Sequence, residues 1–171
     1  MHKEFTDNPD SWFRYHKLRK ERMDQWDEIP YEYIATKIRN RNHKIIDFGC
    51  GENLFRHCVP HNEVISFDHV AIDDSVIACD IKDVSEFVPN ESVDVAMFSL
   101  ALWGTNYKDY ITEAHRVLNF GGVIHIAEPA KSYETPEDEQ GLIDLITESG
   151  FTIVGHIERR SKFIYITGIK M

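Results

Sequence analysis

The sequence has few cysteines, no long apolar run and no broad excess of positive charge. Its three cysteines, Cys50, Cys58 and Cys79, include no C-x-x-C pair, a usage typical of a reducing compartment. No apolar stretch approaches the ~20 residues that a membrane helix needs, and the polar first ten residues lack the features of a secretory signal. We therefore expect an intracellular, cytoplasmic protein that does not enter a membrane.

The net charge of −10 is concentrated in one part of the chain. Residues 1–44 carry ten basic and eight acidic side chains, whereas residues 45–171 carry nine basic and 21 acidic ones. A protein that binds nucleic acid alone usually has a broad basic face, because neutralising phosphates supplies most of the affinity. Here the basic residues gather in an N-terminal helix and in Arg159, Arg160 and Lys162. The charge pattern therefore allows RNA or DNA binding through these two patches without predicting it.

The length of 171 residues suits one hydrophobic core, in which we distinguish an N-terminal helical segment, 1–43, from a domain over 44–171. Apolar residues recur at helical spacing over 9–29 and 30–41. Beyond them, short apolar runs alternate with helical stretches. The expected later helices are 107–118 and 136–149, and the expected strands are 44–48, 64–68, 76–78, 93–100, 123–127, 151–158 and 163–170.

This alternation of strands and helices predicts βαβ units and a parallel sheet covered by helices on both faces. The last two strands are separated only by residues 159–162, so they should form an antiparallel hairpin. The predicted fold is an α/β, Rossmann-like sandwich with a mostly parallel seven-stranded sheet and a C-terminal antiparallel β-hairpin.

A glycine-rich turn follows the first expected strand. Gly49 and Gly51 allow a sharp turn and a close approach of the backbone to a ligand. Asp68 ends the next strand, 19 residues beyond Gly49, where a carboxylate can accept hydrogen bonds from both ribose hydroxyls. Asp80 and Ile81 end the third strand and suit an adenine amino group and ring face. Either acid alone could simply end its strand and cap a turn, but together behind a G-x-G they favour a nucleotide-like ligand.

Asp47 completes the pattern D-x-G-x-G. This acid-first version is the usual opening of class I S-adenosylmethionine (SAM) methyltransferases, where the acid orients the loop or holds the ammonium of the methionine part. An NAD-binding turn more often has a third glycine, and Leu54 stands at that place here. The turn therefore favours SAM over a dinucleotide.

Several further segments resemble one family. They are residues 46–51, 66–68, 78–80, 91–106, and 113–118 followed by Gly121 and Gly122. Together they resemble the ribosomal-RNA-processing (nucleomethylin-type) methyltransferases, which act on N1 of an adenine in large-subunit rRNA. The resemblance covers roughly residues 8–170, and its most specific part is 94–106, with the pattern L-x-L-x-G-T-N.

The resemblance implies that the chain is a class I SAM-dependent methyltransferase, with S-adenosylhomocysteine as the cofactor product. It also implies RNA as the partner and, for a eukaryotic member, a nucleolar location. His16 would reach over the cofactor from the N-terminal helix, and Ser99 would lie beneath its methionine end. The implied cofactor-binding residues are His16, Asp47, Gly49, Gly51, Asp68, Asp80, Ile81 and Ser99.

Three residues are candidates for the acceptor pocket. Methyl transfer needs an acceptor nitrogen held in line with the methyl group more than it needs a strong base. Trp103 could stack on a flipped base, Asn106 could contact the edge of the base, and Glu128 could form the pocket wall. The competing interpretation is that Trp103 packs under the sheet and Asn106 only caps a helix.

The sequence departs from the family at the acceptor side. Residues 119–122 replace the usual Lys-Pro-Gly-Gly, the loop over 129–136 is longer and more acidic, and the family's long basic N-terminal extension is not part of this sequence. A SAM-dependent methyltransferase of a small molecule or protein therefore stays open, as does a SAM-binding module without transfer activity. A partner protein could also supply RNA-binding surface.

A metal site is not expected. His57, Cys58, His61 and His69 lie near one another in the sequence, but they lack a second cysteine pair and a clearly placed fourth ligand. These residues are more typical of a surface turn.

Overall fold

A computed structural model describes residues 8–103 and 106–171. Gly104 and Thr105, which belong to the most specific part of the family resemblance, lie outside the described residues. The helices are α2 (Pro9–Met23), α3 (Pro30–Lys37), α4 (Phe55–Cys58), α5 (Tyr107–Val117) and α6 (Pro136–Glu148), with a short 3-10 turn η1 (Ala130–Ser132). The strands are β1 (Lys44–Phe48), β2 (Glu63–Asp68), β3 (Val76–Ala78), β4 (Val93–Ser99), β5 (Leu118–Pro129), β6 (Phe151–Ile153), β7 (Glu158–Arg160) and β8 (Phe163–Lys170). None of the described helices is long and apolar enough to cross a membrane.

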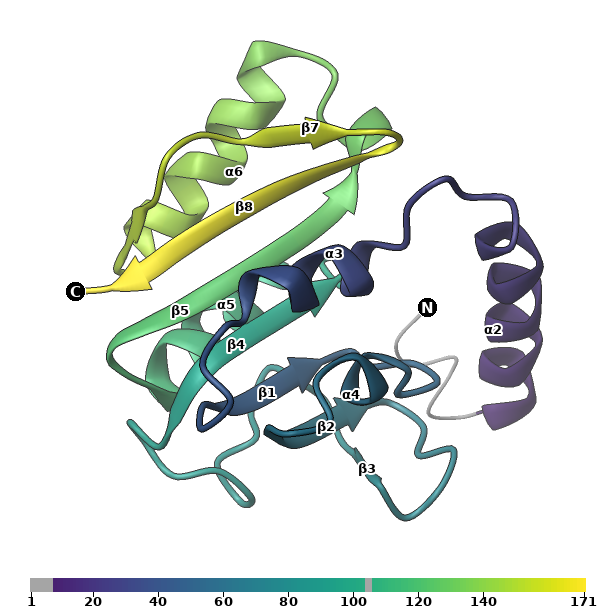
Figure 1. Cartoon of the computed structure of the whole chain (residues 1–171). Helices are drawn as coiled ribbons and strands as arrows, with labels where there is room; N and C mark the ends of the chain where they lie inside the picture. Colours follow the sequence, from purple (N-terminus) through teal and green to yellow (C-terminus); the bar gives the residue numbers. More distant parts are fainter. Residues whose placement is uncertain (1–7, 104–105) are drawn as a thin grey trace.

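One mixed sheet forms the centre of the molecule (Figure 1). The strand order is β3-β2-β1-β4-β5-β8-β6, and β7 pairs with β8 beside this path. Strands β1 to β5 are parallel, whereas β8 runs antiparallel to β5, β6 and β7. This arrangement confirms the predicted α/β sandwich with a C-terminal antiparallel hairpin.

The predicted strand 151–158 is wrong in detail, because it forms two short strands, β6 and β7. Gly155 lies between them with a φ of +74°, a conformation that interrupts a strand. Both strands pair with the eight-residue β8, so the sheet has eight strands instead of seven. The first two helices also end earlier than predicted, at Met23 and Lys37. Ile29 is extended before Pro30, so the first helix cannot reach residue 29, and the extended backbone of Ile38 ends the second helix.

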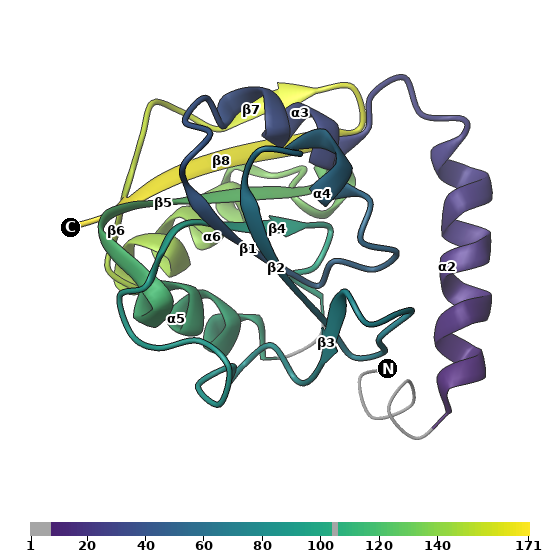
Figure 2. The same ribbon diagram turned by 60° about the horizontal axis from the view of Figure 1, so that its bottom comes forward.

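The sheet separates two apolar layers. Successive residues of a strand face opposite sides, so Ile46 and Phe48 pack toward α5 and α6, while Ile45 packs toward α3 and α4. The rings of Phe48 and Phe98 stack with their centroids 4.9 Å apart. Figure 2 shows α5 and α6 on one face of the sheet and α3 and α4 on the other. Burial on both faces explains why the central strands are nearly continuous apolar runs.

Helix α2 stands apart from both layers. It lies beside the ends to which β1 and β4 point, which are the carboxyl ends of the parallel strands (Figures 1 and 2). Trp12 and His16 are its buried side chains, whereas Phe13, Tyr15 and Leu18 are exposed. This is the edge where ligands bind in open α/β sheets, so α2 is placed to cover such a site.

Candidate functional site

The glycine turn after β1 is tied to β2. The backbone amides of Gly49 and Cys50 each donate to the carbonyl oxygen of Phe67 at 2.9 Å. Gly49 and Gly51 have φ values of +76° and +57°, which favour glycine. A Cβ on Gly49 would lie 2.8 Å from Ala101 Cβ, and one on Gly51 would lie 2.7 Å from a carbon of the His16 ring. Both glycines are therefore required by backbone conformation and by space.

Asp68 connects this turn to α2. Its Oδ2 accepts a hydrogen bond from the Gly51 amide at 2.7 Å, and its Oδ1 accepts one from the Trp12 indole at 2.8 Å. The rings of Trp12 and His16 lie 4.0 Å apart, so both aromatic groups are held over the turn. Burial lowers the pKa of His16 to about 4, against the opposing attraction of Asp68. His16 is therefore a neutral ring at neutral pH.

Trp12 was missed by the sequence reasoning as a site residue. Its position four residues before His16 puts both side chains on one face of α2, and this spacing was the available signal. The indole is 1% exposed, which makes it the main anchor of α2 on the domain.

Asp47 and Ser99 lie near the carboxyl ends of the neighbouring strands β1 and β4 and line the same cavity. Asp47 Oδ1 and Ser99 Oγ are buried and have no hydrogen-bond partner among residues 8–103 and 106–171. Burial, with a smaller contribution from Asp68, raises the pKa of Asp47 to about 8. Both residues line a cavity of about 40 Å³ together with His16 and Arg19. A buried polar pair of this kind is suited to a ligand that brings a cation or hydrogen-bond donors.

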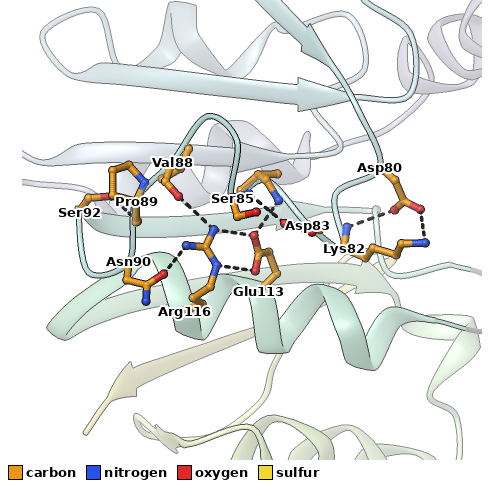
Figure 3. Close-up of polar contacts among 11 residues, drawn as sticks. Asp80, Lys82, Asp83, Ser85, Val88, Pro89, Asn90, Ser92, Glu113 and Arg116 are labelled. Atoms are coloured by element: carbon orange, nitrogen blue, oxygen red, sulfur yellow. Dashed lines mark hydrogen bonds and ion pairs between the residues drawn. The ribbon is translucent and has the colours of Figure 1, made fainter.

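The two residues after β3 have different surroundings. Ile81 is buried and lines a second cavity of about 30 Å³, shared with Asp68, Trp12 and Trp103. Asp80 instead pairs with the Lys82 ammonium at 3.2 Å and accepts from its backbone amide at 3.1 Å (Figure 3). The structure thus brings Ile81 to the site and leaves Asp80 at its edge, where Lys82 competes for its carboxylate.

The loop that carries Asp80 and Ile81 is fastened to α5. Glu113 is buried and accepts from the Val84 amide at 2.7 Å. Arg116 donates to both Glu113 oxygens, at 2.7 and 2.8 Å, and to the side chain of Asn90 at 2.6 Å (Figure 3). Arg116 also donates a hydrogen bond to the carbonyl oxygen of Val88 at 3.0 Å. The segment 113–118 of the family resemblance therefore holds a loop in place.

A larger cleft of about 600 Å³ opens on the other side of α2. Trp103, Glu128 and Tyr133 belong to its walls, and Arg19 connects it with the Asp47–Ser99 cavity. Glu128 is buried, and its Oε1 accepts from the Leu102 amide at 2.9 Å, which fixes the segment after β4. Burial raises the pKa of Glu128 to about 7, although backbone hydrogen bonds oppose the shift. The cleft therefore presents aromatic rings beside a carboxyl group that can change its charge near neutral pH.

Two acceptor-side residues differ from expectation. Asn106 begins α5, but its side chain makes no capping hydrogen bond and instead accepts from the Tyr110 hydroxyl at 3.1 Å. It is not among the residues that line the cleft. Tyr133 does line it and was missed, because its loop over 129–136 has no local pattern that indicates where the ring points.

The basic patch near the C-terminus is largely paired. Arg159 lies 2.5 Å from Glu139, and Arg160 lies 2.9 Å from Glu28. Lys162 is exposed and forms no ion pair with the described residues. Within the same part of the chain, no group of three or more His, Cys, Asp or Glu side chains is arranged to hold a metal ion.

Sequence comparison relates the chain to rRNA-processing proteins. The protein family described as "Hypothetical methyltransferase" matches residues 1–170. Ribosomal RNA-processing protein 8 of Arabidopsis thaliana is 37% identical over 155 residues, which cover 88% of this chain and 53% of that protein. A 25S rRNA (adenine(645)-N(1))-methyltransferase of Schizosaccharomyces pombe is 36% identical over 138 residues, covering 72% of this chain and 42% of that protein. The chain thus spans about half the length, or less, of these relatives.

Solved structures share the fold at low sequence identity. A 1,6-didemethyltoxoflavin-N1-methyltransferase of Burkholderia thailandensis superposes with a TM-score of 0.74 at 18% identity, covering 96% of this chain and 87% of that one. A TehB-like SAM-dependent methyltransferase of Corynebacterium glutamicum gives a TM-score of 0.73 at 15% identity, covering 96% and 100%. The architecture is therefore that of SAM-dependent methyltransferases, and the chain belongs to the methyltransferase family that includes the rRNA-processing proteins.

Proposed function

We propose that this protein transfers a methyl group from SAM to N1 of an adenine in RNA, most simply in rRNA. The observation that carries this proposal is the position of the acceptor cleft. The cleft, with Trp103 and Glu128 in its walls, adjoins the cavity that holds the unpartnered polar atoms of Asp47 and Ser99, and Arg19 lines both. A donor bound at the strand ends and a base bound in the cleft would meet at this shared wall.

The residues at the strand ends fit SAM. The buried acid Asp47 suits the ammonium of a methionine part, and Ser99 beside it offers a second polar atom that lacks a partner among the described residues. Asp68 and Ile81 suit a ribose and an adenine face at the other end. Gly49 and Gly51 leave no room for a Cβ, so the backbone itself forms the floor. Asp80 would reach the adenine amino group after giving up its contact with Lys82.

The N-terminal segment 1–43 completes the site in this proposal. Trp12 and His16 of α2 lie directly over the glycine turn. The indole of Trp12 holds an oxygen of Asp68 that a ribose hydroxyl would also use. A ribose hydroxyl would therefore share this oxygen with the Trp12 indole, and His16 would lie above the cofactor.

The acceptor is inferred from the cleft chemistry and from a relative. The Schizosaccharomyces pombe relative is named for adenine N1 methylation of 25S rRNA. Trp103 and Tyr133 provide aromatic surface for an extruded base. Asn106 would contact the edge of the base only if the segment before α5 moves.

The chemistry asks little of the protein beyond positioning. When bound, SAM supplies a methyl group on a sulfonium sulfur, which keeps the electron pair of the broken C–S bond. The lone pair of adenine N1 forms the new N–C bond, so the base gains one positive charge. Burial raises the pKa of Glu128 to about 7, so this carboxyl group can be ionised near neutral pH and would then stabilise that charge. Trp103 excludes water and orients the ring.

RNA would be held by basic side chains around the cleft, namely those of α2 and Lys162. Because the net charge of −10 repels phosphate over most of the surface, RNA contacts have to be confined to these basic side chains. This function places the protein inside the cell where rRNA is processed, in the cytoplasm or, in a eukaryote, in the nucleolus.

The test is a transfer assay with methyl-labelled SAM and RNA, protein and small-molecule fractions of the source cell. Label recovered as N1-methyladenosine in RNA supports the proposal. Label in protein or small molecules instead of RNA would contradict RNA as the acceptor. If calorimetry shows SAM binding but no fraction becomes labelled, the proposed transfer activity is wrong. Trp103→Ala should lose most turnover and lose SAM affinity to a much smaller extent, because Trp103 also lines the cavity beside Asp68 and Ile81. Phe120→Ala, at an exposed site in β5, should retain both.

A further inference from the structure

A second cleft of about 460 Å³ continues from the acceptor cleft toward the β7–β8 turn. The two clefts share residues of α2, of the segment after β4, and of the segment after β5. The shared residues are Arg22, Trp26, Leu100, Pro129 and Lys131. Together the clefts form one continuous groove. We call the part that extends beyond Trp103 and Glu128, as far as Lys162 and Phe163, the flanking groove.

The flanking groove collects positive charge from three separate parts of the chain. Arg22 comes from α2, Lys131 from η1, and Lys162 from the turn between β7 and β8. All three side chains are exposed, and none forms an ion pair with a residue of the described ranges. Arg159 also lines the groove but is paired with Glu139, and Glu134 is the acid in the wall. In a chain of net charge −10, this convergence produces a local positive site.

An aromatic ring lies among these cations. Trp26 is half-buried, and its indole packs against Phe163 with ring centroids 5.0 Å apart and planes at 69°. The contact holds the ring in the wall that both clefts share. Cations interleaved with a fixed aromatic ring are the combination that binds single-stranded nucleic acid, by phosphate pairing and base stacking. An acidic peptide would use the cations but would gain little from the indole.

We propose that the flanking groove binds the nucleotide next to the target base, with its phosphate between Arg22 and Lys131 and its base on Trp26. Lys162 then meets the following phosphate of the strand. The inference rests on the proposed function, because it assumes that the acceptor cleft takes a base of an RNA strand. It adds a direction: the strand leaves the cleft over η1 toward the β7–β8 turn.

The first test is filter binding of a radiolabelled single-stranded RNA over a series of salt concentrations. Trp26→Ala and the double variant Arg22→Gln/Lys131→Gln should each weaken binding about tenfold or more. The double variant should also lower the slope of log affinity against log salt by about one to two. Arg39→Gln/Arg41→Gln removes the same charge outside the groove and should leave the salt slope within half a unit of the wild type. Trp26→Phe retains a ring and should restore most of the binding.

The second test separates this inference from the proposed function. Each groove variant should keep calorimetric SAM affinity and should raise KM for an oligonucleotide much more than KM for a mononucleotide, because only the oligonucleotide reaches beyond the acceptor cleft. If the wild type methylates RNA but the groove variants match the charge control, the groove assignment is wrong and the proposed function stands. If the wild type methylates no RNA, the proposed function fails, and retained RNA binding through Trp26 and Arg22 would leave a binding groove without the assigned chemistry.

Discussion

Asp68 joins three parts of the molecule through one side chain. It ends β2, holds the glycine turn through the Gly51 amide, and accepts a hydrogen bond from Trp12 on α2. The carboxylate that we propose to bind a ribose is therefore also the contact point of helix α2. A change at this residue should affect ligand affinity and the seating of α2 together.

Replacing Asp68 with alanine should weaken SAM binding. The substitution removes the acceptor of the ribose hydroxyls and leaves the Gly51 amide without its side-chain partner, a loss of about 1–3 kcal/mol. Isothermal titration calorimetry with SAM measures this loss. Asp74→Ala, at an exposed acid of the following loop, is the control. Equal SAM affinity in both variants would remove Asp68 from the cofactor site.

Glu128 should make stability depend on pH. Its pKa is raised from 4.5 to about 7, so the folded state binds this proton more tightly than the unfolded state does. The free energy of unfolding therefore falls as pH rises from about 4.5 to about 7, by up to about 3 kcal/mol from this group. Glu128→Gln keeps the acceptor of the Leu102 amide and cannot ionise.

Urea unfolding of the wild type and of Glu128→Gln at pH 4.5, 6 and 8 checks this effect. Glu128→Gln should become more stable relative to the wild type as pH rises. Glu86→Gln, at an exposed acid, should differ from the wild type in free energy of unfolding by an amount that does not change with pH. If the free energies of unfolding of Glu128→Gln and the wild type differ by the same amount at all three pH values, Glu128 is not the buried carboxyl group that makes stability depend on pH.

The site residues were predictable to different degrees. The common position of Asp47, Gly49 and Asp68 follows from the sequence because parallel strands bring their carboxyl ends to one edge, whereas Ser99 was expected there from the family resemblance. The roles of Trp12 and Tyr133 depend on how α2 and the 129–136 loop pack, which no local pattern specifies. The acceptor role of Asn106 stays a prediction, since its side chain contacts Tyr110 outside the cleft.

Helix α5 and the loop between β3 and β4 form a unit at the element scale. The guanidinium of Arg116 bridges Glu113 on the helix and two backbone or side-chain oxygens of the loop. Glu113 in turn holds the Val84 amide. This unit positions Ile81 in the wall of the cavity of about 30 Å³ beside Asp68, although neither Glu113 nor Arg116 lines that cavity.

Arg116→Met should therefore loosen the loop. The substitution leaves the buried Glu113 carboxylate without its cation and costs about 2 kcal/mol of stability. It should also weaken SAM binding severalfold, because the loop that carries Ile81 is no longer fixed. Thermal unfolding and calorimetry test both effects. Lys108→Met on the same helix removes a fully exposed pair and should change neither, so equal behaviour of the two variants would contradict the role of Arg116.

The elements themselves were largely predictable because each strand of the parallel part is a short apolar run. The residues at which the strands and helices begin and end were less predictable. The division of 151–158 into β6 and β7 depends on pairing with one long partner strand, a non-local contact that periodicity does not report. Strand β5 also begins at Leu118, directly after α5, with Gly121 inside the strand at a φ of +77°. The sequence pattern had instead extended the helix to residue 118 and begun the strand only at residue 123.

At the scale of the whole molecule, cohesion is uneven. The sheet and its two helical layers share buried side chains on both faces, and α3 is further tied to β7 by the Lys37–Glu158 ion pair. Helix α2 is held chiefly by Trp12 and His16. The molecule thus consists of a rigid body and one weakly attached helix at the site edge.

Amide hydrogen exchange should show this difference. Peptides from α2 should exchange much faster than those from β4 and β5, because few buried apolar contacts oppose local opening of the helix. Trp12→Phe, which removes the hydrogen bond to Asp68, should speed exchange in α2 and leave β4 unchanged. Protection of α2 equal to that of the central strands would contradict the weak attachment.

The placement of the tryptophans has a practical consequence. The chain has three, and all of them line cavities of the candidate site: Trp12 and Trp103 line the cavity beside Asp68, Trp103 and Trp26 line the acceptor cleft, and Trp26 continues into the flanking groove. All indole emission of the native protein therefore originates from side chains that line these cavities, the buried Trp12 included. Three single Trp→Phe variants would separate the optical signals of the covering helix, the target base and the outgoing strand, so that each ligand could be titrated without any label.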